Sequence, residues 1–249
     1  MLRTNPSFLF RNLLHELPRG TPLTAAWLQE KGLNTKQTAR LAEEGWLQRL
    51  GRGVYLLPGD ALSRDACLTQ LSRTIPGLHV ASKTALAWRG IRHNLALKEH
   101  LALWGDAPAN LPAWFTAVFP ASYQSTHLFD AGLPPMTGLA PLPSGSADVL
   151  VSTPERALLE LLSDVGKGQG LEEAAHLVES ARSLRLPVLE QLLVHLQRIK
   201  VVRLASNLAQ NLGLPWAELA RQHSVRLGGG ERWVSTTASG ERLNLRCPV

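Results

Sequence analysis

Donor-bearing polar and basic side chains gather between residues 31 and 52: Lys31, Thr35, Lys36, Gln37, Arg40, Arg49 and Arg52. Glutamine can pair with adenine, and lysine or arginine can donate to the O6 and N7 atoms of guanine. Cations beside such a reading set meet phosphates or the adjacent minor groove. This chemistry suits double-stranded DNA, provided that one helix presents residues 35–40 and a neighbouring element carries the last two arginines.

The surrounding sequence predicts two short helices before this set. The pair Asn5-Pro6 is typical of a helix start, and apolar residues then recur at helical spacing until Pro18. A second helix is expected to begin near Thr21 or at Thr24 and to stop at residues 31–32, where glycine follows lysine.

The reading residues themselves fall on a third predicted helix. It is capped by Asn34 or Thr35, runs to about Glu44, and ends at Gly45. The residues expected to face the core are Ala39, Leu41 and Ala42. Two short helices joined by a tight turn form a helix-turn-helix, whose second helix enters the major groove of DNA.

The next segment, WLQRLGRGVYLLPG at residues 46–59, predicts a β-hairpin. Strand-forming residues flank Gly51-Arg52-Gly53, which supplies a tight turn. The hairpin is interpreted as a wing that places Arg49 and Arg52 beside the third helix. We therefore predict a winged helix-turn-helix domain over residues 1–59 and a second domain over residues 60–249.

The second domain is predicted to be a larger mixed α/β domain with a helical bundle portion and terminal strands, so the whole chain is α+β. The expected helices cover residues 63–75, 82–90 with Ser82 as cap, 153–162, 171–184, 187–197, 201–212 and 216–222. The expected strands cover residues 78–80, 101–104, 115–119, 148–152, 225–227, 232–236 and 242–245.

Glycine-rich and acidic motifs elsewhere do not complete a catalytic constellation. Asp148 follows Gly145-Ser146-Ala147, but the paired acid that would hold Mg²⁺ in a nucleotidyltransferase is missing. Residues 166–170 (GKGQG) lack the ending of a phosphate-binding loop, and the glycines at 228–230 precede a strand, which favours a turn. The histidines are scattered, and Cys67 is expected to pack in the core. We expect no enzyme activity, cofactor or metal.

Charge is concentrated where the DNA-reading residues lie. The first 58 residues hold eight Lys/Arg against four Asp/Glu. This excess of positive charge makes up most of the formal net charge of +6. The two cysteines, Cys67 and Cys247, predict no disulfide framework, and no apolar run reaches the roughly 20 residues that span a bilayer. Together with an N-terminus interrupted by Arg11 and His15, these features predict a cytoplasmic protein without membrane contact.

The segment Leu23–Leu57, above all GWLQRLGRGVYLLPG, resembles the N-terminal winged helix of AbiEi-type antitoxins. The likeness continues in ASKTAL at residues 81–86, in VSTPERALLELL at residues 151–162 and in the closing strands around Arg232 and Leu243–Leu245. It therefore spans nearly the whole chain. AbiEi-type proteins are the antitoxin and autorepressor of type IV toxin–antitoxin systems.

The resemblance implies that the N-terminal domain represses its own operon by binding inverted repeats in promoter DNA. The C-terminal domain would counteract a nucleotidyltransferase-like toxin, either directly or functionally. Carried over by position, Lys36, Gln37 and Arg40 would read bases, and Arg49 and Arg52 would be the wing contacts. A monomer and a dimer, with or without cooperativity on DNA, both stay open.

Two alternatives compete with this reading. One is a winged-helix regulator whose C-terminal domain senses a small molecule and has no toxin partner; the other is an enzyme with a winged-helix accessory domain. A further basic set in the later helices is interpreted as a salt-bridged, solvated face in preference to a second polyanion-binding surface: Arg182, Arg185, Arg198, Lys200 and Arg203.

Overall fold

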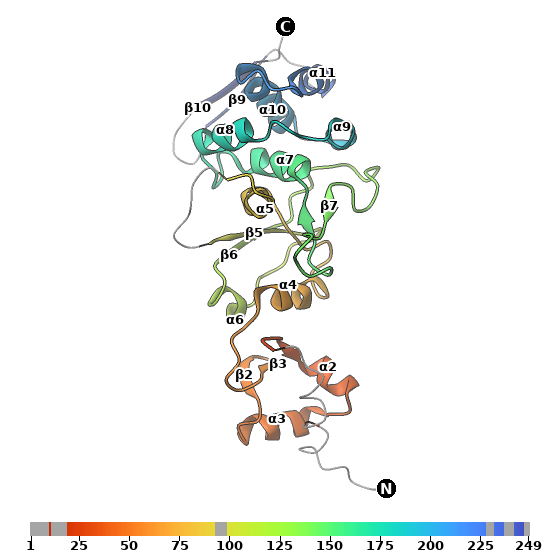
Figure 1. Cartoon of the computed structure of the whole chain (residues 1–249), viewed down its shortest axis with the longest axis vertical. Coiled ribbons are helices and arrows are strands. Elements are labelled where there is room, and N and C mark those ends of the chain that lie inside the picture. Colours follow the sequence, from red (N-terminus) through yellow and green to blue (C-terminus); the bar gives the residue numbers. More distant parts are fainter. Residues whose placement is uncertain (1–9, 11–18, 93–98, 228–231, 237–241, 247–249) are drawn as a thin grey trace. The chain divides into compact units, whose positions relative to one another are not determined.

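The computed structural model describes residues 10, 19–92, 99–227, 232–236 and 242–246 (Figure 1). The chain divides into two compact units, unit 1 with residues 1–74 and 110–120 and unit 2 with residues 75–109 and 121–249. Both combine helices with strands, which confirms the predicted α+β class. Unit 1 includes α4 (Arg64–Ser72) and α6 (Ala113–Thr116) besides the predicted winged helix. A separate domain at residues 1–59 stays a prediction.

Unit 1 contains the predicted pair of helices, α2 (Ala25–Glu30) and α3 (Thr35–Glu43). The structure selects Thr24 as the cap of α2, because its hydroxyl accepts from the Trp27 amide at 3.2 Å. At α3 the side chain of Asn34 accepts from the Gln37 amide at 2.9 Å, while the Gln37 side chain accepts from the Asn34 amide at 2.8 Å. This reciprocal capping box satisfies backbone donors that a helix start leaves unpaired and fixes where α3 begins.

The predicted hairpin is confirmed as β2 (Gln48–Gly51) and β3 (Val54–Leu56). A third strand, β1 (Leu23–Thr24), pairs with β3, so the antiparallel sheet has the order β1-β3-β2. Gly53 has φ +69°, a conformation that side chains disfavour, and it closes the turn after Arg52. The pairing shifts register between Arg49 and Gly51, next to this turn.

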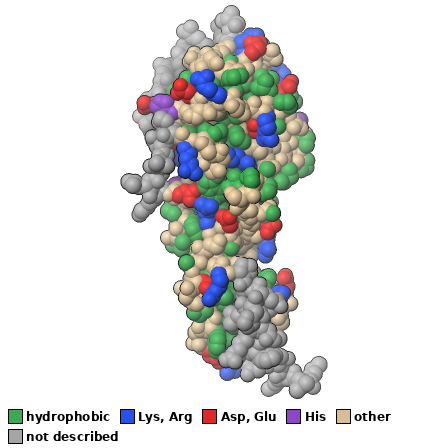
Figure 2. Space-filling model, viewed as in Figure 1, with side chains coloured by type: hydrophobic (Ala, Val, Ile, Leu, Met, Phe, Trp, Pro, Cys, Tyr) green, Lys and Arg blue, Asp and Glu red, His purple; other side chains and the backbone are tan. Residues whose placement is uncertain are grey.

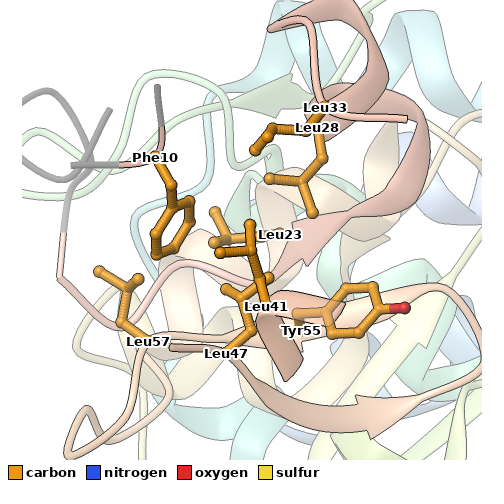
Figure 3. Packing of buried hydrophobic residues seen from close by; sticks show 8 residues of the cluster. All are labelled: Phe10, Leu23, Leu28, Leu33, Leu41, Leu47, Tyr55 and Leu57. Atoms are coloured by element: carbon orange, nitrogen blue, oxygen red, sulfur yellow. The ribbon is translucent and has the colours of Figure 1, made fainter. Parts of the chain in front are cut away.

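One cluster of buried side chains holds the helices and hairpin of unit 1 together (Figure 3). Its members are Phe10, Leu23, Leu28, Leu33, Leu41, Leu47, Tyr55 and Leu57. Phe10 is the one described residue of the predicted first helix; the rest of that helix lies outside the described residues. The prediction that Ala39 faces the core is wrong: Ala39 is exposed and Thr38 is buried. Thr38 and Leu41 are three residues apart and therefore share one face of α3.

Unit 2 is built on a mixed five-stranded sheet of order β6-β5-β4-β8-β7. The pairs β4/β8 and β5/β6 are parallel, whereas β4/β5 and β7/β8 are antiparallel. The strands, in sheet order, are β6 (Ala121–Gln124), β5 (Leu101–Trp104), β4 (His79–Val80), β8 (Val151–Ser152) and β7 (Leu139–Ala140).

Helix α7 (Pro154–Asp164) is the centre of the helical portion of unit 2. It is buried on nearly every side because it contacts four other helices, and Figure 1 shows it lying between α5 and the group formed by α8 and α9. Those helices are α5 (Ser82–Trp88), α8 (Leu171–Ser180), α9 (Leu186–His195) and α10 (Ile199–Asn211). Helix α11 (Ala217–Leu227) and the antiparallel pair β9 (Arg232–Thr236) and β10 (Arg242–Arg246) follow.

Several boundaries differ from the predictions. Residues 115–119 form the end of α6 and a turn instead of a strand, because the helical turn begins at Pro112, whose carbonyl accepts from the Phe115 amide. Residues 225–227 extend α11, where the Arg226 side chain donates to backbone carbonyls at the end of α9. Ser82 is the first residue of α5 and not its cap, with φ +52°. The Arg226 bonds join segments that are far apart in the sequence, and such contacts leave no local signal from which to predict them.

A buried carboxylate on α7, that of Glu160, joins the sheet to the helices. It accepts from the Ser152 hydroxyl on β8, from Arg156 Nε at 2.9 Å and from the Ser82 amide at 3.1 Å, and it lies 3.1 Å from His79 Nε2 on β4. Burial acts to raise the pKa of Glu160, but His79 and Arg156 outweigh it and leave the pKa below its ordinary value. The carboxylate is therefore charged and fully partnered.

Glu155, one turn earlier, ties α7 to the start of α9. It accepts from the Arg185 guanidinium at 2.9 and 3.0 Å, from the Arg185 amide and from the Thr153 hydroxyl. Thr153 is the residue before the first turn of α7, but its hydroxyl donates to Glu155 and does not cap the helix. Burial acts to raise the pKa of Glu155, yet these bonds lower it to about 2.

We predict that Asn34→Ala loosens the start of α3, because the Gln37 amide loses its acceptor. The loss of such a cap costs about 1 kcal/mol, so hydrogen exchange of the Gln37 amide should accelerate about fivefold. Asn34→Asp keeps a side-chain oxygen and should exchange like the wild type. Equal protection in the wild type and Asn34→Ala would show that the cap contributes nothing.

We also predict that Glu155 makes unit 2 sensitive to acid. Its folded pKa of about 2 lies below the ordinary 4.5, so its contribution is complete above about pH 4.5 and is lost as the pH falls toward 2. Glu155→Gln should reduce the free energy of unfolding by about 1–3 kcal/mol at neutral pH and should flatten the acid dependence in that range. Urea unfolding measured at neutral and acidic pH gives both quantities.

Glu190→Gln, at an exposed position on α9, is the control and should change the free energy of unfolding by less than about 0.5 kcal/mol. The same acid dependence in Glu155→Gln and in the wild type would contradict the role given to Glu155.

Candidate nucleic-acid interface

The outer face of α3 carries most of the predicted reading residues. Thr35, Lys36 and Arg40 are exposed, on the side away from the buried Thr38 and Leu41. The first turn of α3 contains no acidic residue, so the positive end of the helix dipole is not neutralised by its own side chains. The start of α3 is therefore electrically favourable for a phosphate or for acceptors on base edges.

Gln37 differs from the other members of the set because it is half-buried and belongs to the capping box. Its side-chain oxygen already accepts from the Asn34 amide. A bidentate contact with adenine needs both that oxygen and the NH₂ group. In this conformation the oxygen is already shared with the backbone, so the NH₂ group of Gln37 is the group left unengaged for a base.

Arg40 is exposed but held by an acid on its own helix end. Its Nε atom donates to Glu44 Oε1 at 2.7 Å, while its side chain stays 72% exposed. The two terminal nitrogens of the guanidinium remain as donors, and these form the fork that fits guanine. The bond also offsets the charge of Glu44, which would otherwise repel phosphate near this surface.

The remaining cations of the set lie outside α3, Lys31 after the end of α2 and the two arginines in the hairpin. Lys31 places its ammonium 5.6 Å from the centre of the Trp27 ring, and Arg49 Nε donates weakly to the Gly51 carbonyl at 3.4 Å. Arg52 is exposed in the hairpin turn. Within the described ranges, Lys36 and Arg52 have no hydrogen bond or ion pair. These two are the cations most available to an external anion.

The basic residues of the later helices do not form a second such surface. Arg185 pairs with Glu155, Arg203 is 2% exposed, and Lys200 donates to the carbonyls of Ser163 and Val165 at 2.8 Å. Burial, aided by nearby cations, lowers the pKa of Lys200 to about 8. The interpretation as a solvated face is therefore wrong for Arg203, which is buried, and for Lys200, whose ammonium is bonded to backbone carbonyls. In Figure 2 the blue side chains of unit 2 are scattered singly over the visible face.

Two of the motifs set aside in the sequence lie in loops, as expected, and the glycines at 228–230 lie outside the described residues. Residues 145–148 form an exposed turn before β8, in which the Asp148 amide donates to the Ser146 hydroxyl at 3.3 Å. Residues 166–170 connect α7 to α8. In the described part of the chain, no group of three or more His, Cys, Asp or Glu residues is placed to hold a metal. No helix among the described residues is long and apolar enough to cross a membrane.

Two family models match adjoining parts of the chain. One is described as "Transcriptional regulator, AbiEi antitoxin N-terminal domain" and matches residues 7–97. The other is described as "Transcriptional regulator, AbiEi antitoxin, Type IV TA system" and matches residues 98–245. The chain belongs to the AbiEi antitoxin family. The resemblance inferred from the sequence is thereby confirmed.

The fold of this AbiEi chain also occurs in a solved structure. The crystal structure of the RV2827C protein from Mycobacterium tuberculosis is similar, with a TM-score of 0.60, 16% sequence identity and coverage of 90% of this chain and 82% of that chain. At this identity the likeness concerns the fold alone. No curated protein matches the AbiEi chain.

The sequence predictions missed the part that Gln37 plays in the capping box, although the sequence contains a signal for it. Asn34 is followed three residues later by Gln37, and that spacing is a capping-box pattern. The pattern indicates that Gln37 serves the helix start, which competes with the role in base reading that it was given.

Proposed function

We propose that this chain is a DNA-binding antitoxin and transcriptional autorepressor. Its winged helix binds operator repeats in its own promoter, and its C-terminal part counteracts a cognate nucleotidyltransferase-like toxin. The observation that carries the DNA-binding half is the exposed, firmly capped α3 with Lys36 and Arg40 on the face opposite the core. Membership of a family of antitoxin transcriptional regulators supports both halves.

The dimensions and rigidity of α3 favour insertion into the major groove. An α-helix is about 10–12 Å across with its side chains, which fits a groove about 12 Å wide, and the nine residues of α3 give it a length of about 14 Å. The capping box at Asn34 and the buried Leu41 fix the helix at both ends. A rigid reading helix binds without the entropy cost of ordering it on DNA.

Each member of the interface has a proposed task. Lys36 and Arg40 donate to base edges, Thr35 contacts a base or the adjacent phosphate, and Gln37 donates through its NH₂ group. The peripheral cations contact phosphates or the neighbouring minor groove: Lys31, Arg49 and Arg52. Inverted repeats then require two such helices, supplied by two monomers or by a dimer.

We predict that Lys36→Ala weakens binding to the DNA upstream of the gene. Loss of a base contact costs about 1–3 kcal/mol, and loss of a phosphate contact reduces the slope of log K against log salt by about one unit. Fluorescence anisotropy with a labelled promoter fragment over a series of salt concentrations measures both. Glu44→Gln should act in the opposite direction, because it removes an acid from the surface and releases Arg40.

Arg182→Ala is the matched control, since it removes an exposed cation from unit 2 and should leave the affinity unchanged. The proposal fails if the full chain does not bind the fragment at low salt, or if the Lys36 and Arg182 variants lose the same affinity.

We predict that the full chain restores growth of cells that express the nucleotidyltransferase-like product of the adjacent gene, with both genes under unrelated promoters. Lys36→Ala should rescue growth as well as the wild type, because the antitoxin activity is assigned to the C-terminal part. Growth curves with and without induction of the toxin give the result. Persistent growth arrest with the wild-type chain, at confirmed expression, would contradict the antitoxin assignment.

A further inference from the structure

A short segment of unit 1, residues 110–120, returns to the hairpin from far along the chain. In the sequence it lies between β5 and β6, which belong to unit 2, yet its helix α6 contacts β2 of the hairpin. We use the name wing for the hairpin formed by β2, its turn and β3. The wing is therefore packed against residues that lie far outside the winged-helix sequence.

Trp114, on α6, packs against the wing at Gly51. The Cβ atom of any other residue at position 51 would lie 3.3 Å from Trp114 Cδ1, which is closer than ordinary van der Waals contact. The backbone does not require glycine here, because Gly51, unlike Gly53, is not among the described residues with positive φ. At position 51 the neighbouring indole ring, and not the backbone, therefore restricts the size of the side chain.

The position of Trp114 is fixed by the residue that follows it. Phe115 is 0% exposed, and its ring lies edge to face with the Trp114 ring and packs against Phe119, with centroid distances of 6.1 and 5.5 Å. The helical turn begins at Pro112, whose carbonyl accepts from the amides of Phe115 and Thr116 at 3.0 and 3.2 Å. The half-buried indole is therefore a fixed surface against which the wing can pack.

The strand that receives this contact carries or adjoins the two wing arginines. Strand β2 lies at the edge of the sheet β1-β3-β2, and its pairing with β3 shifts register between Arg49 and Gly51. Such an irregularity bends an edge strand and changes the direction of the side chains beside it. Arg49 and Arg52 lie within two residues of Gly51, and both are exposed. A contact at Gly51 therefore acts at the point that sets the direction of both arginines.

We propose that Trp114 is a positioning residue for DNA binding. By packing on Gly51 it holds the wing in the arrangement in which Arg49 and Arg52 contact phosphates or the minor groove, so the inference rests on the proposed DNA binding. Residues 110–120 contain no charged side chain, and the segment itself adds nothing to the electrostatic attraction. A change in salt dependence on replacing Trp114 therefore reports on the arginines of the wing.

The test is fluorescence anisotropy of the full chain with a labelled promoter fragment over a series of salt concentrations. Trp114→Ala should weaken binding about fivefold and reduce the slope of log K against log salt by about one unit, although no cation is removed. Trp114→Phe keeps a ring atom at the Cδ1 position and should bind within about twofold of the wild type, with an unchanged slope.

A double-mutant cycle shows whether Trp114 acts through the arginines. In a chain that already carries Arg49→Ala and Arg52→Ala, Trp114→Ala should weaken binding by less than about a further twofold. In a chain that carries Lys36→Ala, it should still cause the full loss of about fivefold, because Lys36 lies on α3 and not in the wing. A ring that only stabilised the fold, or that contacted DNA directly, would cause the same further loss in both backgrounds.

Gly51→Val tests the same contact from the wing and leaves α6 unchanged. Valine suits an extended backbone, but its side chain would collide with the indole ring, so this variant should show the same loss of affinity and of salt dependence as Trp114→Ala. It also decides the question by the same criteria if circular dichroism shows that Trp114→Ala does not fold.

The inference is overturned if the folded variant binds like the wild type, or if its loss of affinity is undiminished in the chain that lacks both wing arginines. Absence of binding by the wild type at low salt would overturn the proposed DNA binding, and the role of Trp114 with it. The two failures are therefore distinguishable.

Discussion

The buried carboxylate of Glu160 is the constraint on which unit 2 depends. It brings together His79 on β4, Ser82 on α5, Ser152 on β8 and Arg156 on α7, so one side chain positions both sheet and helices. A charge without solvent exposure is tolerable only when every lone pair has a partner, and removal of one partner leaves an uncompensated charge. The same bonds set the strained start of α5. The network therefore links β4, β8, α5 and α7 through one carboxylate.

Unit 1 solves a different problem, because it must present a polar helix to solvent and still hold it rigidly. Leu41 and the surrounding cluster fix one face of α3, and the capping box fixes its first turn. In this arrangement the Gln37 side chain is bonded to the Asn34 backbone amide. Lys36 and Arg52, which form no hydrogen bond or ion pair within the described part of the chain, keep their hydrogen-bonding capacity. The residues that support the fold and those available to a partner are thus largely separate.

The sequence predicted the helices and the hairpin between residues 21 and 57 well because their signals are local. Asn34 as a cap, the glycine turn at Gly53 and the apolar spacing each act within a few residues, and the resulting elements agree with the structure. Unit 2 was less predictable because its decisive contacts join residues far apart in the sequence. In the sequence, Glu160 is one more polar position on an amphipathic helix. No residue near it indicates its contact with His79, which lies 81 residues away.

The net charge of the chain does not show which of its cations are available to DNA. Counted along the chain, the cations of the later helices suggest a polyanion-binding surface, but Arg185, Lys200 and Arg203 are bonded to an acid, bonded to carbonyls or buried. Cations engaged in this way release few counterions and add little to DNA affinity. Lys36 and Arg40 of unit 1, in contrast, remain exposed on one short helix. Electrostatic attraction to DNA should therefore be governed by a small group of side chains near Lys36, whatever the formal charge of the whole chain.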